Sequence, residues 1–118
     1  MSPWTPFQPS EDALPPKEVK FLEVRAEPWP DGRRVRVHLR VTPFLERPNV
    51  EVIISDVEDQ EVASISIIES IDEAMSFTMH IKGNDNNGKY TLTANLSYPE
   101  IGPVAQDSVT FEVFATNE

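Results

Sequence analysis

The sequence predicts an all-β fold, a sandwich of seven short antiparallel strands, and three observations favour it. From residue 18 onward, apolar and polar side chains alternate with a period of two. Clusters of Pro, Gly, Asn and Asp separate these alternating runs at regular intervals, as turns do between strands. Runs with the 3.6-residue period of an amphipathic helix are almost absent. Together these features are typical of two stacked antiparallel sheets, each with one buried and one wet face.

Seven runs carry the alternation, at residues 18–27, 33–41, 49–56, 62–70, 75–82, 89–98 and 108–115. In the clearest of them, residues 33–41, valine or leucine alternates with arginine or histidine. In the first run the apolar positions change from odd-numbered to even-numbered residues between Phe21 and Leu22. We therefore expect Leu22 to face the interior. This switch predicts a bulge or a strand that changes sheets. Residues 99–106 contain two prolines, so we expect a loop there.

The chain of 118 residues is long enough for one domain. We predict that residues 1–17, which hold five of the eleven prolines, form an extended arm, and that residues 18–118 form the sandwich. No cysteine is present, which excludes thiolate zinc sites and cysteine nucleophiles.

The charge and hydropathy of the chain indicate its cellular compartment and the classes of partner that it suits. The N-terminus lacks the basic and apolar regions of a signal peptide, and no run reaches the ~18 apolar residues of a membrane span. We therefore expect a soluble, cytoplasmic chain. The net charge of −10 disfavours nucleic acid and membrane surfaces as partners, because phosphate binding needs clustered Lys and Arg.

One motif is specific. The spacing Asn86-x-Gly88-x-Tyr90-x-Leu92 resembles the Asp-x-Gly-x-Tyr-x-Cys signature of immunoglobulin-like domains. The resemblance implies that Tyr90 is a "tyrosine corner", whose hydroxyl bonds to nearby backbone, and that the third, sixth and seventh strands are neighbours. Leu92 replaces the cysteine, and the third run lacks the core tryptophan. The chain therefore resembles disulfide-free immunoglobulin-like or fibronectin type III-like modules, whose members mostly bind, space or assemble.

Catalytic and metal-binding patterns are weak. The histidines, His38 and His80, fall on the expected outward faces of strands, and no glycine-rich phosphate loop occurs. The acidic stretches 56–61 and 84–88 offer oxygen ligands without the spacing of an EF-hand, so we interpret them as polar hairpin tips. We expect no enzyme activity, no metal site and no cofactor.

A basic strip is the first candidate partner-binding surface. Arg34, Arg36 and Arg40, with His38 among them, stand about 7 Å apart along one strand face. Such a strip suits an acidic partner or a carboxylated ligand. The alternative is cross-strand pairing with acidic residues of the first strand, such as Glu23 and Glu27.

A second candidate surface lies on the opposite sheet. Ile53 and Phe114 are apolar residues expected on its wet face, where they flank a hydroxyl-rich strip. The pair suits an oligomer interface or a sugar-binding face. Lone exposed apolar residues are also normal, and the arm could cover them.

The arm is the third candidate. Pro3, Pro6 and Pro9 share one edge of a polyproline II helix, and Trp4 and Phe7 share the next. These aromatics either pack on the sandwich of their own chain or bind another chain. The sequence thus favours a non-catalytic protein-interaction or assembly module, self-association into a homodimer included. The alternative is a carbohydrate-binding module that uses a sheet face.

Overall fold

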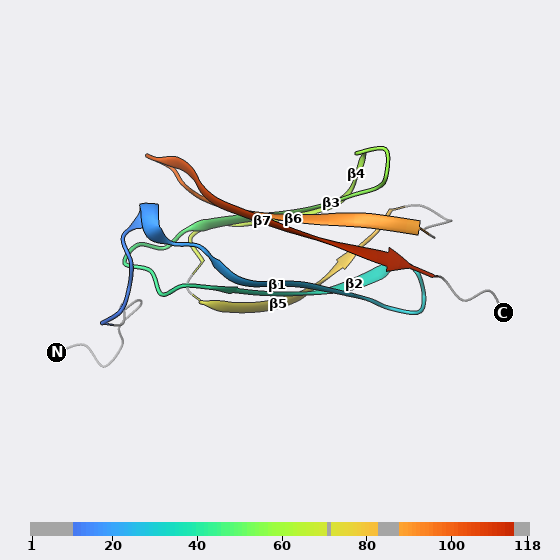
Figure 1. Ribbon diagram of the computed structural model, residues 1–118, viewed down its shortest axis with the longest axis horizontal. Coiled ribbons are helices and arrows are strands. Elements are labelled where there is room, and N and C mark those ends of the chain that lie inside the picture. Colours follow the sequence, from blue (N-terminus) through green and yellow to red (C-terminus); the bar gives the residue numbers. More distant parts are fainter. Residues whose placement is uncertain (1–10, 71, 83–87, 115–118) are drawn as a thin grey trace.

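The computed structural model describes residues 11–70, 72–82 and 88–114. In that part of the chain it shows a short 3₁₀ helix and the seven expected strands (Figure 1). The bounds are η1 Pro16–Glu18, β1 Phe21–Pro28, β2 Arg34–Val41, β3 Asn49–Ser55, β4 Glu61–Ile67, β5 Ala74–His80, β6 Gly88–Tyr98 and β7 Gly102–Val113.

The strands form two sheets that lie face to face, so the sandwich predicted from the sequence is confirmed (Figure 1). The order is β1-β2-β5 in one sheet and β4-β3-β6-β7 in the other, and all paired strands are antiparallel. The third, sixth and seventh strands are neighbours, as expected. The fourth joins them, whereas in a constant-type immunoglobulin sandwich it belongs to the opposite sheet. As a result, β5 is the last strand of the three-stranded sheet.

The core forms where the inward residues of both sheets meet. The alternation in β2, β3 and β6 places one apolar side chain of every two in the interior. The fully buried side chains include Val35, Val37, Leu39, Val41, Val50, Val52, Ile54, Leu92 and Leu96. Tyr90 is also buried, and its ring stacks on that of Phe111 with a centroid distance of 5.8 Å. The backbone bond implied for its hydroxyl stays a prediction, and Asn86 of the motif lies outside the described residues.

The bulge predicted in the first strand is confirmed, but the predicted side for Leu22 is wrong. Phe21 pairs with Val41 and Glu23 pairs with Arg40, so Leu22 is the extra residue that has no partner of its own. The bulge turns the side chain outward, and it is 51% exposed. A sequence period can locate a phase change, but it does not identify which residue the bulge expels.

The loop expected at residues 99–106 is largely strand. β7 begins at Gly102, and Pro103 lies opposite Ser97 where the pairing register with β6 shifts. Because β7 is the last strand of its sheet, the missing N–H of a proline leaves no ladder partner unsatisfied on its open side.

The described end of the arm packs on the sandwich. Leu14 forms a parallel bridge with Phe44: its N–H donates to the Pro43 carbonyl over 2.9 Å, and its carbonyl accepts from Leu45 over 2.9 Å. Trp4 and Phe7 lie outside the described residues, so both interpretations of these aromatics stay predictions. In the described segments, no helix is long and apolar enough to span a membrane.

Candidate interaction surfaces

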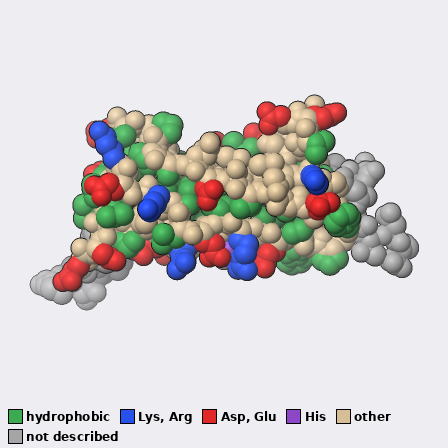
Figure 2. All heavy atoms as spheres, in the orientation of Figure 1, with side chains coloured by type: hydrophobic (Ala, Val, Ile, Leu, Met, Phe, Trp, Pro, Cys, Tyr) green, Lys and Arg blue, Asp and Glu red, His purple; other side chains and the backbone are tan. Residues whose placement is uncertain are grey.

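The first surface is the outer side of the β1-β2-β5 sheet, which we call the basic face. Its centre is the β2 row of Arg34, Arg36, His38 and Arg40. In Figure 2, basic, acidic and histidine side chains gather along the lower margin, where Figure 1 places this sheet. The antiparallel register sets Glu27 opposite Arg36 and Arg25 opposite His38.

Cross-strand bonds occupy the middle of the basic face. His38 Nε2 lies 2.8 Å from Glu27 Oε1, and its Nδ1 lies 2.9 Å from Ser76 Oγ. Arg36 donates to Thr78 Oγ1 over 3.5 Å. The hydrogen bond to His38 holds the pKa of Glu27 below its ordinary value, with Arg25 adding to the effect and desolvation opposing it. These residues therefore satisfy one another across strands, as the alternative interpretation of the strip expected.

Arg34 is committed to the hairpin between β1 and β2. Its Nε lies 2.7 Å from Asp31 Oδ2, and its guanidinium stacks 4.0 Å from the centre of the Trp29 ring. Asp31 Oδ1 also accepts from the backbone N–H of Arg33 and of Arg34. The bond from Arg33, then that from the Arg34 side chain, lowers the pKa of Asp31 to about 2. Arg34 therefore anchors a turn and is poorly placed to bind a ligand.

Arg40 differs from Arg34 at the other end of the strip. It lies opposite Glu23, but Glu23 pairs with Arg25, whose Nε is 3.6 Å from its carboxylate. Among the described residues Arg40 forms no ion pair. Arg36 is also exposed and forms no ion pair with a described residue, so Arg36 and Arg40 are the two arginines of the predicted basic site that have no carboxylate partner.

The second surface is the outer side of the β4-β3-β6-β7 sheet, which we call the hydroxyl face. Two cross-strand rows form its centre: Ser66, Glu51, Asn95 and Gln106, and beside them Ser64, Ile53, Thr93 and Ser108. Glu51 is the single charged side chain in these rows. Gln106 Nε2 donates to Asn95 Oδ1 over 2.7 Å.

The structure does not bring Ile53 and Phe114 together. Ile53 is half-buried in the middle of β3, between the fully buried Val52 and Ile54. Phe114 directly follows β7 and is 71% exposed. One strand, β6, lies between β3 and β7, and six residues of strand, about 20 Å, separate Phe114 from the row that holds Ile53. They do not form the joint apolar site that the sequence suggested.

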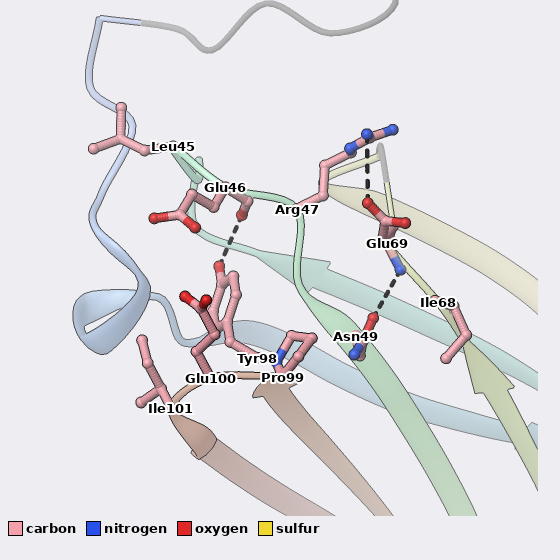
Figure 3. A pocket seen from close by; sticks show the side chains of 10 residues that line it. All are labelled: Leu45, Glu46, Arg47, Asn49, Ile68, Glu69, Tyr98, Pro99, Glu100 and Ile101. Carbon is pink, nitrogen blue, oxygen red and sulfur yellow. Dashed lines mark hydrogen bonds and ion pairs between the residues drawn. The ribbon is translucent and has the colours of Figure 1, made fainter.

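The sequence did not reveal a pocket at the end of the sandwich. It has a volume of about 550 Å³ and lies where three connections meet (Figure 3). Its lining is Leu45, Glu46, Arg47, Asn49, Ile68, Glu69, Tyr98, Pro99, Glu100 and Ile101. Leu45, Ile68 and Ile101 are exposed. Only the buried position of Tyr98 was readable in advance, because the pocket depends on how loops far apart in sequence meet.

Polar contacts fix the pocket walls. The Tyr98 hydroxyl donates to the Glu46 carbonyl over 2.8 Å (Figure 3). Burial, with the nearby Glu46 charge, raises the pKa of Tyr98 to about 12. The Asn49 side chain accepts from the Glu69 N–H over 2.9 Å, which supports a left-handed Glu69 with a φ of 52°. Arg47 and Glu69 close one side with an ion pair of 3.5 Å.

The acidic stretch 56–61 forms a tight turn whose oxygens have local partners. Asp56 Oδ1 accepts from the backbone N–H groups of Glu58 and Gln60, over 2.9 and 3.0 Å. No group of three His, Asp or Glu side chains is arranged to hold a metal ion within the described segments. Residues 84–87 of the other polar tip lie outside those segments.

Comparison with known proteins gives structural matches only. No protein-family model matches the chain, and no curated protein matches its sequence. A glycosyl hydrolase family 2 member from Bacteroides cellulosilyticus DSM 14838 superposes with a TM-score of 0.61 at 12% identity, covering 80% of this chain and 15% of that one. The β-glucuronidase of Lactobacillus rhamnosus gives 0.56 at 17% identity, covering 81% and 16%.

A third solved structure, Ruminococcus gnavus β-glucuronidase bound to D-glucuronic acid, gives a TM-score of 0.53 at 16% identity. It too is matched over 81% of this chain and 16% of its own length. At these identities the likeness shows a shared β-sandwich fold and nothing about activity. The chain spans about one sixth of the length of the enzymes it matches.

Proposed function

We propose that this chain is an immunoglobulin-like, non-catalytic protein-interaction and assembly module. The hydroxyl face is the single observation that carries the proposal. A quarter of the residues in the chain are charged and the net charge is −10, yet the two central rows of this face hold one charge among eight side chains. Depletion of charge is the compositional mark of the centre of a protein interface.

The size of the face fits this use. Four strands about 4.8 Å apart and up to twelve residues long give a surface on the order of 500 Å². A stable interface buries roughly 800 Å² on each partner. The face therefore supplies the centre of an interface, and the exposed Phe114 and the ends of the strands supply its rim.

A carbohydrate-binding module is the second candidate, and it uses the same face. The Asn95–Gln106 amide pair and the rows of hydroxyls offer the donors and acceptors that sugars need. The matched fold occurs within glycosidases, although as a small part of them. Against this candidate, the ring of Trp29 lies on the hairpin of the other sheet, and Arg34 covers it.

One substitution tests the protein-interaction proposal. Thr93→Arg places a charge at the centre of the hydroxyl face, and Leu22→Arg at the exposed bulge of β1, on the other sheet, is the control. We expect partners recovered from an extract of the source cells to be lost with Thr93→Arg and kept with the control. Mass spectrometry would identify them. Identical recovery with both variants would refute the proposal, and loss of binding on a glycan array with Thr93→Arg alone would support the second candidate instead.

A further inference from the structure

One of the four strands that end the sheets lacks the usual protection against pairing. Edge strands are normally blunted by charges, prolines or bulges. β1 has a bulge and alternating acidic and basic residues, β7 has Pro103 and a register shift, and β4 has Glu61 beside a register shift. β5 is seven residues long, with the sequence AMSFTMH. It has no Asp, Glu, Lys, Arg or Pro, and its register with β2 is uninterrupted.

The backbone of β5 presents one free ladder edge. Hydrogen bonds at its two ends show which residues face β2: the Val41 N–H donates to the Glu73 carbonyl over 2.8 Å, and the Ile81 N–H donates to the Arg33 carbonyl over 2.7 Å. Antiparallel ladders alternate, so the even-numbered residues from 74 to 80 direct their N–H and C=O groups away from β2. Within the described part of the chain, β5 pairs with β2 alone.

Partly exposed apolar side chains lie beside the free edge of β5. Ile65 and Ile67 of β4 and Met75 and Phe77 of β5 pack against the core but remain partly exposed along the seam between the sheets. Two hollows of about 400 and 310 Å³ follow one another along the seam, the first lined by Phe77. A backbone bond of 3.1 Å, from the Lys82 N–H to the Val62 carbonyl, links the two runs beyond the end of β5.

We propose that β5 pairs antiparallel with β5 of a second copy of this chain, so that two three-stranded sheets join into one of six strands. This inference deepens the proposed function and rests on it, since it names the surface through which an assembly module self-associates. A two-fold interface repeats one contact twice, so a single matched pair of residues stabilises it at both ends.

Charge and parity select one register. Even-numbered residues must face even-numbered residues for their free N–H and C=O groups to bond. The register centred on Phe77 satisfies this over the whole strand, with Ala74 opposite His80 and Ser76 opposite Thr78. It also sets Asp72 of each copy opposite Lys82 of the other. Both side chains are exposed and have no ion-pair partner among the described residues. A shift of two residues in either direction shortens the ladder and separates this pair.

The same register explains why Phe77 stays partly exposed. At the two-fold axis it faces its own copy as a non-hydrogen-bonded pair, with Cα atoms about 4.5 Å apart. Its ring, on the inner side of the sheet, then joins the two apolar seams and covers the open side of the hollow it lines. A homodimer with an acidic charge on each copy needs such a locally uncharged and complementary contact.

Sedimentation equilibrium on the full chain tests the dimer. We expect the mass to rise from 13.3 kDa toward twice that value between micromolar and millimolar concentration. The double variant Ser76→Lys/Thr78→Lys, which puts four ammonium groups at the junction, is expected to remain monomeric. Ser108→Lys/Thr110→Lys on the edge strand β7 is the matched control and is expected to dimerise. A wild-type chain that stays monomeric at 1 mM, or a dimer that survives the β5 variant, would overturn the proposal.

A charge swap tests the register without altering β5. Asp72→Lys and Lys82→Asp should each weaken the homodimer at least several-fold, whereas their equimolar mixture should form a heterodimer, since every facing pair is then opposite in charge. Equal dimerisation by both single variants and by the mixture would refute the register. The Thr93→Arg variant leaves β5 intact, so loss of a partner there and loss of the dimer here report on separate surfaces.

Discussion

The outer faces of the two sheets use polar residues in opposite ways. On the basic face, Glu27, His38, Ser76 and Arg36 bond across strands, and Arg34 is held by Asp31. On the hydroxyl face the central rows carry short uncharged side chains, with one amide pair between Asn95 and Gln106. A conspicuous run of charges in a strand can thus be satisfied in part within its own sheet. A surface with few charges is less noticeable in a sequence, and it is the surface for which we propose a partner.

The largest expected effects lie beneath both faces. Leu39→Ala under the basic face and Leu92→Ala under the hydroxyl face should each lower the free energy of unfolding by about 3 kcal/mol, since both side chains are buried in the shared core. Urea unfolding measures this loss. Leu22→Ala, at an exposed position, is the control and should change stability by less than about 0.5 kcal/mol. A loss as small as that of the control at either position would contradict the burial of that side chain in the shared core.

The hydrogen-bonded hydroxyl of Tyr98 should contribute more to stability than the exposed hydroxyls of the hydroxyl face. Tyr98→Phe removes the bond to the Glu46 carbonyl and should cost about 1 kcal/mol. The pKa of Tyr98 is raised to about 12 from 10. Its contribution is therefore complete below pH 10 and is lost as the pH rises toward 12. Unfolding measured between pH 9 and pH 12 should show a steeper loss for the wild type than for Tyr98→Phe. Parallel curves would contradict the raised pKa.

Lowering the pH should change the stability contributed by the two faces differently, and this effect should be smaller than those above. The pKa of Asp31 is lowered to about 2 from 3.8, so its contribution is present above pH 3.8 and disappears as the pH falls toward 2. Asp31→Asn should flatten the decline of stability with acid over this window. Thr91→Val on the hydroxyl face removes no titrating group and should leave the decline unchanged. An unchanged slope in Asp31→Asn would show that the turn does not depend on this carboxylate.

The smallest effect is expected at the centre of the hydroxyl face. Thr93→Val removes a half-exposed hydroxyl and should change stability by less than about 0.5 kcal/mol, because no bond within the described residues depends on it. Thermal unfolding and partner binding, measured on the same samples, should then separate: stability is kept while binding weakens. A stability loss near that of Tyr98→Phe would show that the Thr93 hydroxyl makes a stabilising hydrogen bond.

Period-two patterns predicted the fold well where one face of a strand is fully buried. In β2 and β6 every apolar side chain assigned inward is buried, because the pleat alone decides the side on which a residue lies. The patterns did not predict the sheet to which β4 belongs, since either sheet would bury the same side of that strand. They also missed the early start of β7, because a proline at an open edge breaks no hydrogen bond.

The candidate sites were less predictable, for a related reason. The sequence correctly placed Arg34, Arg36 and Arg40 on one row, but their availability depended on Glu27, Asp31 and Thr78, which reach them through register and turn geometry. The period of two predicts that Ile53 and Phe114 face the same way, but it does not give the distance between them. The end pocket has no sequence signal of its own, since loops from three parts of the chain form it.

The direction in which β1 and β7 enter and leave the sandwich has a mechanical consequence. Figure 1 shows the described chain beginning at one end of the long axis and β7 finishing at the other. Tension applied through the two chain ends therefore acts along the β1–β2 and β6–β7 ladders, not across them. Under such a load the hydrogen bonds of a ladder are sheared and must break together, whereas a load across the strands would break them one at a time.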